Sequence, residues 1–218
     1  MRHSNTDWRG RAAAGSVAAI MLVLAGCGQA PPQGPAWDFV RMGMDGEERG
    51  DAAVGHDCVL DRRTGLLWEV KQSTAGPRSL DNRYSWYSGD AAEHNSEPGL
   101  MDGGECELDR CDTEAFVAAV NQQGLCGRND WRLPSRDEAL TLLDATLIGQ
   151  GPTLDPGYFP NTVKGEYWTA TTFRPYPQGA WAIDSVYAQD RVDWKTNAKH
   201  VRLVSGAKNS VKPKRRGK

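Results

Sequence analysis

The sequence contains few of the residues that most catalytic and metal sites use. It has only four histidines, and neither Ser135 nor Ser205 lies in a Gly-x-Ser-x-Gly motif. None of its five cysteines forms a Cys-x2-Cys pair and no histidine lies at ligand spacing, which disfavours a zinc site. Acidic residues are plentiful, but their spacing does not indicate a glycosidase pair. The sequence therefore predicts a protein that is not an enzyme.

Basic residues are scarce in the central part of the chain. Residues 28–206 hold 17 Lys and Arg against 27 Asp and Glu, a balance of −10, whereas the whole chain has a formal charge of −2. Nucleic-acid binding needs clustered cations against the phosphates, so this acidic body disfavours a nucleic-acid partner. Residues 207–218 contain six basic residues and no acidic one. We expect a disordered basic tail there, with contact to anionic lipid or polysaccharide as the alternative.

Long hydrophobic runs are also missing, because no segment reaches the ~20 apolar residues of a membrane-spanning helix. The N-terminus instead has three arginines, a short apolar run and then Leu24-Ala25-Gly26-Cys27, which fits the bacterial lipobox. We therefore predict a lipoprotein signal peptide at residues 1–26 and acylation, including palmitate, at Cys27. Two or more acyl chains anchor a protein firmly to a membrane. Gly28, in place of Asp, favours the outer membrane as the destination of this exported protein.

The mature chain divides into a linker, a domain and the basic tail. Residues 27–36 are rich in Pro, Gly and Gln and have nothing to bury, which predicts a linker next to the lipid. Residues 37–206 have the composition of a globular domain. The 24 Gly, 12 Pro and 8 Trp of the chain indicate many turns and an aromatic interior.

Two helices are predicted in this domain. Thr113–Gln123 has an apolar stripe, with Asp112 or Thr113 as its N-cap and a glycine directly after it. Ser135 starts the second helix, because the Ser-x-x-Glu pattern there forms a capping box. Leucines continue the apolar stripe of this helix as far as Leu147.

Short apolar or alternating segments predict the strands of the domain. They lie at 37–41, 58–61, 66–70, 167–172, 180–184, 192–194 and 200–204. A turn with a glycine at its end joins the second and third of them into a hairpin. Two helices packed on short antiparallel strands give an α+β fold.

Four cysteines remain after Cys27, and an even number in an exported protein predicts two disulfides. We favour Cys106–Cys111 as a staple within the irregular loop 71–112, together with Cys58–Cys126. The alternative is Cys58–Cys106 with Cys111–Cys126. A loop of this length in a compact domain is usually functional or stapled.

Aromatic residues near irregular segments are the candidates for ligand contact. Tyr84, Trp86, Tyr87, Tyr176 and Trp194 are placed to stack on sugar rings or to pack against a protein partner, and core packing is the alternative for Trp86. Alternating or corner positions place four other tryptophans in the core. These are Trp68, Trp131, Trp168 and Trp181.

Calcium is the one cofactor that the sequence indicates. Asp102, Glu105 and Asp109 concentrate oxygen ligands in the 102–109 segment, as hard cations need, although their spacing is not that of an EF-hand. The alternative is an acidic loop that is simply solvated.

Several motifs in order along the chain resemble one known family. They are Cys58-Val-Leu-Asp-Arg-Arg-Thr-Gly-Leu-Leu-Trp-Glu-Val-Lys71, Tyr84-Ser-Trp-Tyr87, Cys111-Asp-Thr-Glu-Ala-Phe-Val-Ala-Ala-Val-Asn121, Gly124-Leu-Cys-Gly127, Asp130-Trp-Arg-Leu-Pro-Ser-Arg-Asp-Glu138, Tyr167-Trp-Thr-Ala-Thr171, Ala180-Trp-Ala-Ile-Asp184 and Val201-Arg-Leu-Val204. Together they make residues 57–206 similar to the Lcl C-terminal domain family, which takes its name from a collagen-like bacterial adhesin and is catalogued as a domain of unknown function.

The resemblance implies a fold like those of C-type lectins and the formylglycine-generating enzyme. It also implies surface attachment and, for some members, binding of glycosaminoglycans or other polymers. No catalytic residue is carried over, because the family has no agreed ones. The chain departs from the collagen-like adhesin in having no Gly-x-y repeat.

These observations predict a membrane-anchored bacterial envelope lipoprotein with a non-catalytic, adhesin-like binding domain. Its expected partner is a polysaccharide, such as a glycosaminoglycan, or a surface protein. The alternative is an envelope enzyme whose site is formed by the 71–112 loop and the strand ends, and a structural envelope component is a third option.

Overall fold

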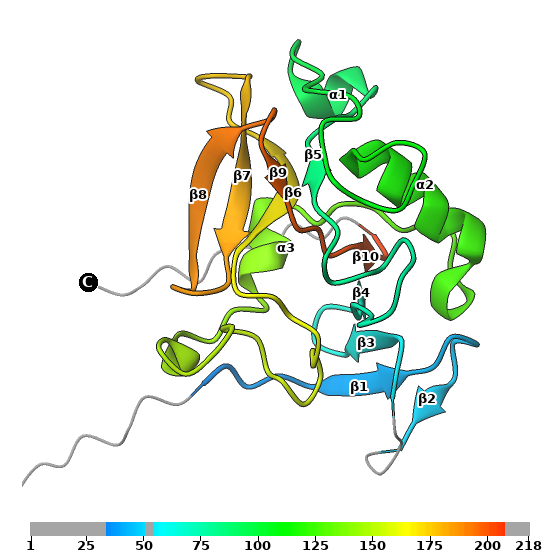
Figure 1. Cartoon of the computed structure of the whole chain (residues 1–218). Coiled ribbons are helices and arrows are strands. Elements are labelled where there is room, and N and C mark those ends of the chain that lie inside the picture. Colours follow the sequence, from blue (N-terminus) through cyan, green and yellow to red (C-terminus); the bar gives the residue numbers. More distant parts are fainter. Residues whose placement is uncertain (1–33, 51–54, 208–218) are drawn as a thin grey trace, which may run out of the picture. The chain divides into compact units, whose positions relative to one another are not determined.

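The computed structural model describes residues 34–50 and 55–207 (Figure 1). The predicted signal peptide, Cys27, most of the linker and residues 208–218 of the basic tail lie outside this part of the chain. No helix among the described residues is both long and apolar enough to cross a membrane. The described residues form a mixed α+β domain with antiparallel strands and two disulfides.

An antiparallel sheet of five short strands contains the predicted hairpin. In that hairpin Cys58 pairs with Glu69, and the C-terminal end of the domain adds a further strand in which Val204 pairs with Trp68. The strands are β1 (Phe39–Met42), β2 (Glu48–Arg49), β3 (Cys58–Asp61), β4 (Leu66–Glu69) and β10 (Val204–Ser205), in the order β10-β4-β3-β1-β2. The first and last parts of the domain are therefore held in one sheet.

A second antiparallel sheet contains three strands that the sequence also predicted. They are β6 (Glu166–Thr172), β7 (Gly179–Asp184) and β8 (Gln189–Trp194), in the order β6-β7-β8. The register places Gly179 opposite Trp194 and Trp181 opposite Val192. β8 is an edge strand, and it lies on the left in Figure 1.

The prediction of one continuous strand at 200–204 is wrong, because only Val204 of this segment belongs to a strand. Its other residues lie between two very short strands, β10 and β9 (Ala198–Lys199), and β9 pairs with β5 (Tyr84–Ser85). Between them the chain crosses from one sheet to the other, because His200 exchanges backbone hydrogen bonds with β6 while the carbonyl of Leu203 accepts one from β4. Partners in two different sheets prevent one continuous strand from forming.

The helix Thr113–Gln123 (α2) is confirmed, and the Asp112 side chain caps it by accepting from the Ala115 amide. The capping box at Ser135 is also present, but its helix, α3 (Arg136–Leu140), ends well before Leu147. The chain turns there because Asp144 caps a separate 3-10 turn, η2. The other helical elements are α1 (Ala91–His94), η1 (Leu125–Gly127) and η2 (Ala145–Leu147).

The core contains two clusters of buried side chains, one around Trp86, Trp131 and Trp168 and the other around Trp68. Three of the four tryptophans predicted to be core are therefore buried, whereas Trp181 is only half-buried. The indole N–H of Trp131 donates to the Leu125 carbonyl at 3.0 Å. The Cys58–Cys126 disulfide joins β3 to η1 beside this indole, so the segment around Trp131 is structural.

Candidate functional site

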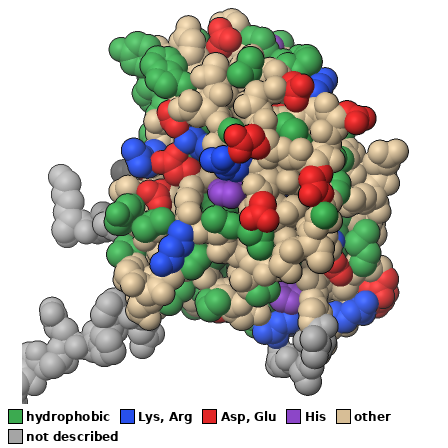
Figure 2. Space-filling model, viewed as in Figure 1, with side chains coloured by type: hydrophobic (Ala, Val, Ile, Leu, Met, Phe, Trp, Pro, Cys, Tyr) green, Lys and Arg blue, Asp and Glu red, His purple; other side chains and the backbone are tan. Residues whose placement is uncertain are grey.

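A groove lined by aromatic side chains lies at the end of the three-stranded sheet where β6 connects to β7. Tyr176 and Trp194 border it with 66% and 59% of their surfaces exposed, so these two predicted contact residues come together at one place. The cavity measures about 220 Å³, and its lining residues are Phe173, Tyr176, Gly179, Val192, Asp193 and Trp194. Figure 2 shows hydrophobic side chains gathered at the upper left, over the connection between β6 and β7.

Sheet register explains why these residues share a face. Side chains opposite each other in neighbouring strands point to the same side, and so do residues two apart along one strand. The pairs Gly179–Trp194 and Trp181–Val192 therefore lie on one face. Gly179 contributes no side chain there, which leaves the floor of the groove open between Tyr176 and Trp194.

The connection between β6 and β7 holds Tyr176 in place. The amide of Phe173 donates to the carbonyl of Gly179, the amide of Tyr176 donates to that of Phe173, and the amide of Gly179 donates to that of Tyr176. The Phe173 ring lies 6.0 Å from that of Tyr176 and packs edge-on against Trp181 at 5.5 Å. A hydrogen-bonded turn and a row of three rings thus fix one wall of the groove.

Asp193 borders the groove through its backbone, because the register places its carboxylate on the face opposite Val192 and Trp194. Its carboxylate accepts hydrogen bonds from Lys199 at 2.5 Å, from Asn197 at 2.9 Å and from the Trp194 amide at 2.8 Å. Burial acts to raise the pKa of Asp193, but these hydrogen bonds outweigh it and hold the pKa below its usual value. The residue is therefore an ionised hydrogen-bond acceptor at neutral pH.

Trp86 and Tyr84 are not contact residues, and the prediction that they bind a ligand is wrong. Both are fully buried. The Trp86 indole donates to the Thr169 carbonyl at 2.8 Å, and the Lys195 ammonium lies 3.9 Å from the centre of its ring. Tyr84 stacks on Phe116 with ring centres 4.7 Å apart. These rings belong to the core because β5 lies between β9 and α2, inside the domain.

Tyr87 lies apart from the groove. It is half-buried, and the guanidinium of Arg110 lies 5.7 Å from the centre of its ring. Its backbone amide donates to the Thr113 hydroxyl at 2.9 Å. The structure therefore separates Tyr87 from Tyr176 and Trp194.

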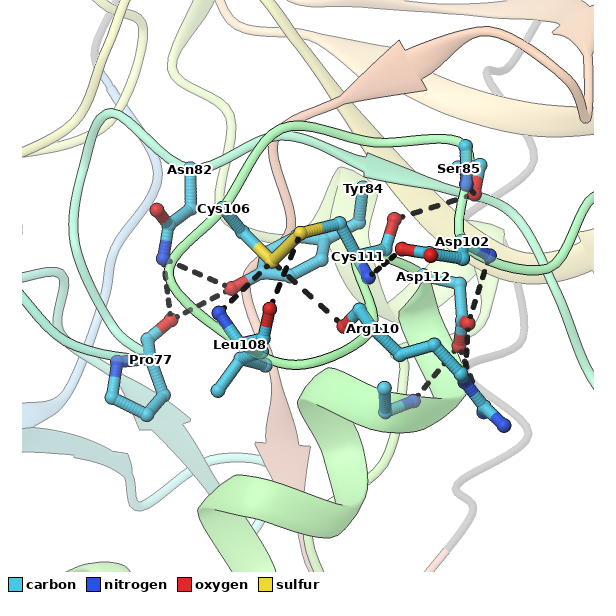
Figure 3. The surroundings of a disulfide bond; sticks show 12 residues. Pro77, Asn82, Tyr84, Ser85, Asp102, Cys106, Leu108, Arg110, Cys111 and Asp112 are labelled. Carbon is cyan, nitrogen blue, oxygen red and sulfur yellow. Dashed lines mark hydrogen bonds and ion pairs between the residues drawn. A yellow bond between two sulfur atoms is a disulfide. The ribbon is translucent and has the colours of Figure 1, made fainter.

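The loop that contains Asp102 is stapled by Cys106–Cys111, as Figure 3 shows. Both disulfides thus have the pairing that the sequence favours. The Asp102 carboxylate accepts from the Cys111 amide at 2.8 Å, and Glu105 pairs with Arg83 at 2.5 Å. Within the described ranges, no three His, Cys, Asp or Glu side chains are grouped so as to hold a metal ion. The carboxylates of Asp102, Glu105 and Asp109 are therefore not grouped as metal ligands in this geometry, and calcium binding stays a prediction.

Two more hollows are lined by polar side chains. One of about 320 Å³ lies between α1 and β6, and one of about 340 Å³ lies beside His56. His56 and His200 each bond to a backbone carbonyl, and burial lowers the pKa of both. Among the described residues, no histidine hydrogen-bonds to a Ser, Asp or Glu side chain, so no triad is assembled there.

Sequence reasoning identified Tyr176 and Trp194 but missed the residues between them, namely Phe173, Gly179, Val192 and Asp193. The available signal was the alternation along residues 189–194, which places Val192 and Trp194 on one side. It was missed because β8 was predicted to be only three residues long, and because Trp181 on the same face was assigned to the core. Arg136 explains the intermediate burial of Trp181, since its guanidinium lies 4.0 Å from the ring centre.

Comparison with known proteins identifies the family. The family model of the Lcl C-terminal domain matches residues 57–205. No curated protein and no solved structure matches the chain. β1 and β2 lie before the matched segment and still form part of its five-stranded sheet. The chain belongs to the Lcl C-terminal domain family.

Proposed function

We propose that this protein is a bacterial envelope lipoprotein whose domain binds a polysaccharide through the aromatic groove, without catalysing a reaction. The observation that carries the proposal is the pair of exposed rings, Tyr176 and Trp194, on either side of a floor that Gly179 leaves open. The family agrees with this function, since it suggests an adhesin-like domain.

The groove has the chemistry that sugar binding needs. A sugar ring presents an apolar face of C–H groups and a rim of hydroxyls, and Tyr and Trp combine a large apolar face with a polar group. Tyr176 and Trp194 offer such faces at the two borders. Two rigid rings lose little conformational entropy on binding, which favours their use as contacts.

Loss of either ring should weaken binding while the fold is kept. We expect Trp194→Ala and Tyr176→Ala to weaken the affinity of the full-length chain on a glycan array by about tenfold or more, which corresponds to ~1.4 kcal/mol or more. Tyr187→Ala is the matched control, because Tyr187 is 60% exposed but lies in the β7–β8 turn, at the opposite end of the hairpin. If Trp194→Ala and Tyr176→Ala bind as tightly as the control Tyr187→Ala, the groove is not the binding site.

Membrane attachment through Cys27 is the second part of the proposal, supported by the Leu24-Ala25-Gly26-Cys27 motif. Radiolabelled palmitate should be incorporated by the wild-type chain in bacteria and not by Cys27→Ala. Fractionation should place the labelled protein in the outer membrane. Labelled Cys27→Ala protein would show that the lipid is attached elsewhere.

The fold type also belongs to this proposal. We propose a fold related to those of C-type lectins and the formylglycine-generating enzyme, supported by the short antiparallel strands, the helices beside them and the two disulfides. An experimental structure whose strand connections differ from both of those folds would contradict it.

A further inference from the structure

We infer that β8 is a self-association surface, at which two copies of this chain pair edge to edge and join their three-stranded sheets into one antiparallel sheet. The inference does not depend on the proposed function, because it concerns the edge of the sheet and not the face that carries the groove. It follows from the direction of the backbone groups of β8, from its charge pattern and from the exposure of its side chains.

The outer edge of β8 presents backbone groups that point away from the sheet. Residues of an antiparallel strand alternate between hydrogen bonding to the neighbouring strand and pointing away from it. The amide of Lys195 donates to the carbonyl of Gln178 at 2.9 Å, in register with β7 and β8. Val192 and Asp190 are out of phase with Lys195, so their amides and carbonyls point away from β7. Among the described residues no strand or isolated bridge pairs with this side of β8, which lies on the left in Figure 1.

The charge pattern of β8 fits a second copy of the same strand in one register. Two copies pair antiparallel about a two-fold axis, so the residue at the centre lies opposite itself. A centre at Asp190, Arg191 or Asp193 places identical charges directly opposite each other, which is destabilising. A centre at Val192 brings the outward backbone groups of its two copies together. It also places Arg191 of each copy opposite Asp193 of the other, so opposite charges flank the centre on both sides.

The side chains that this register uses are accessible. Arg191 is exposed and bonds to Glu166 at 3.0 Å, and it lies on the same face of β8 as the Asp193 carboxylate, two residues away. A guanidinium has five N–H donors and a carboxylate about four acceptor positions, so each accommodates a further partner. On the opposite face Val192 and Trp194 are exposed apolar residues. A free edge that carries exposed apolar side chains favours pairing with another chain.

Pairing of this kind places both grooves on one face of the joined sheet. The two-fold axis of an antiparallel pair is perpendicular to the sheet, so Trp194 faces the same way in both copies. One polysaccharide chain bound at both grooves gains apparent affinity without any new contact. This consequence rests on the proposed function, whereas the pairing itself does not.

Cysteine cross-linking tests the pairing and its register. The full-length chain carrying Val192→Cys is oxidised in an excess of detergent micelles. The two Cα atoms at the centre of the pair lie about 5.5 Å apart, within the range of a disulfide, so we expect a covalent dimer. Arg191→Cys should give at least tenfold less dimer, because its two copies are more than ~7 Å apart in this register. Tyr187→Cys, in the exposed β7–β8 turn, is the control for chance collisions.

Sedimentation of the chain without introduced cysteines gives a second measurement. The wild type should form dimers at concentrations up to about 100 µM. Arg191→Asp should raise the dimer dissociation constant by about tenfold or more, because carboxylates then lie opposite each other at both flanking positions. Arg191→Lys keeps the charge and should stay within about threefold of the wild type.

Three results would overturn the inference. They are a wild-type chain that stays monomeric, an Arg191→Cys chain that cross-links as readily as Val192→Cys, and a Val192→Cys chain that cross-links in bacterial membranes only to a different protein. Neither measurement involves a polysaccharide. A failure of the pairing is therefore distinct from a failure of the proposed function, which the Trp194→Ala and Tyr176→Ala variants test.

Discussion

Two aromatic segments of this domain look alike in sequence and differ in structure. Tyr84 and Trp86 lie beside an irregular loop, and so do Tyr176 and Trp194. The first pair is fully buried, whereas more than half of the surface of each residue in the second pair is exposed. The difference comes from position, because β5 is enclosed by β9 and α2 while β8 is an edge strand. An aromatic residue near a loop is thus exposed only where its strand or turn has a free side.

The contrast is sharpest between two consecutive residues. Trp194 is 59% exposed, and Lys195, which follows it, is only 1% exposed. The Lys195 ammonium lies over the Trp86 ring and donates to the carbonyls of His94 and Glu97, at 3.2 and 2.5 Å. Here the alternation of the extended chain, rather than side-chain polarity, decides which residue is buried. Lys195 therefore ties α1 to the core, while Trp194 remains at the surface.

The largest effect on stability is expected from truncating Trp86, the buried tryptophan of the first segment. Trp86→Ala removes a filled volume of the core and a hydrogen bond to Thr169, so it should lower the free energy of unfolding by about 3–5 kcal/mol. The melting temperature should fall by roughly 10 °C. Trp194→Ala is the matched control and should melt within about 2 °C of the wild type. Equal melting temperatures for the two variants would show that the buried Trp86 and the exposed Trp194 contribute equally to stability.

Removal of the buried disulfide should likewise cost more stability than removal of the disulfide in the partly exposed loop. Cys58–Cys126 closes a loop of 68 residues and is buried, whereas Cys106–Cys111 closes one of 5 in the partly exposed loop. Cross-linking restricts the unfolded chain more when the loop is longer, so removal of the first should cost about 4 kcal/mol and of the second about 2 kcal/mol. Paired Cys→Ala variants and urea unfolding measure both. A larger loss from the Cys106/Cys111 variant would show that this loop carries more of the stability than its position indicates.

Lys195, the buried neighbour of Trp194, should make the stability of the domain depend on pH. Burial lowers the pKa of Lys195 to about 8 in the folded protein, and Glu97 only partly offsets this. The unfolded chain titrates near 10.4, so between these values it binds more protons and the folded state gains stability as pH rises. Relative to Lys195→Met, the wild type should therefore gain roughly 1–2 kcal/mol between pH 7 and pH 10.5.

Urea unfolding at four pH values measures this difference. Lys71, whose pKa burial also lowers to about 8, remains in both proteins and cancels in the comparison. Trp194→Ala should follow the wild-type profile. If the free energy of unfolding changes with pH in the same way for the wild type and for Lys195→Met, the lowered pKa of Lys195 is wrong.

Local chemistry explains the parts of the fold that sequence predicted. The β3–β4 hairpin, helix α2 and the Ser135 capping box each depend on residues within a few positions of one another. The disulfide pairing favoured from the sequence matches the structure because Cys106 and Cys111 are near neighbours in the chain. Cys58 and Cys126 are then left to pair with each other.

Long-range packing explains the parts that sequence did not predict. The crossing segment at 200–204 alternates like a strand, but its partners belong to two sheets. The burial of Trp86 depends on Thr169 and Lys195, which lie far away in sequence. The groove likewise needs Phe173 and Asp193 to approach each other across β7, and no local pattern in the sequence indicates that.

The smallest effect is expected from a single methyl group in the floor of the groove. A Cβ at Gly179 would lie 3.0 Å from Cγ1 of Val192 and 3.4 Å from the carbonyl oxygens of Tyr176 and Asp193. The Val192 side chain yields by a few tenths of an ångström, so Gly179→Ala should cost less than about 1 kcal/mol of stability. It should nevertheless weaken polysaccharide binding by roughly threefold, because the methyl group occupies space between the two rings. Gly151→Ala is the control, since a Cβ there meets nothing within 4 Å. Unchanged affinity in Gly179→Ala would mean that a ligand rests on the rings without reaching the floor, and the exposed face would then act as a platform instead of a groove.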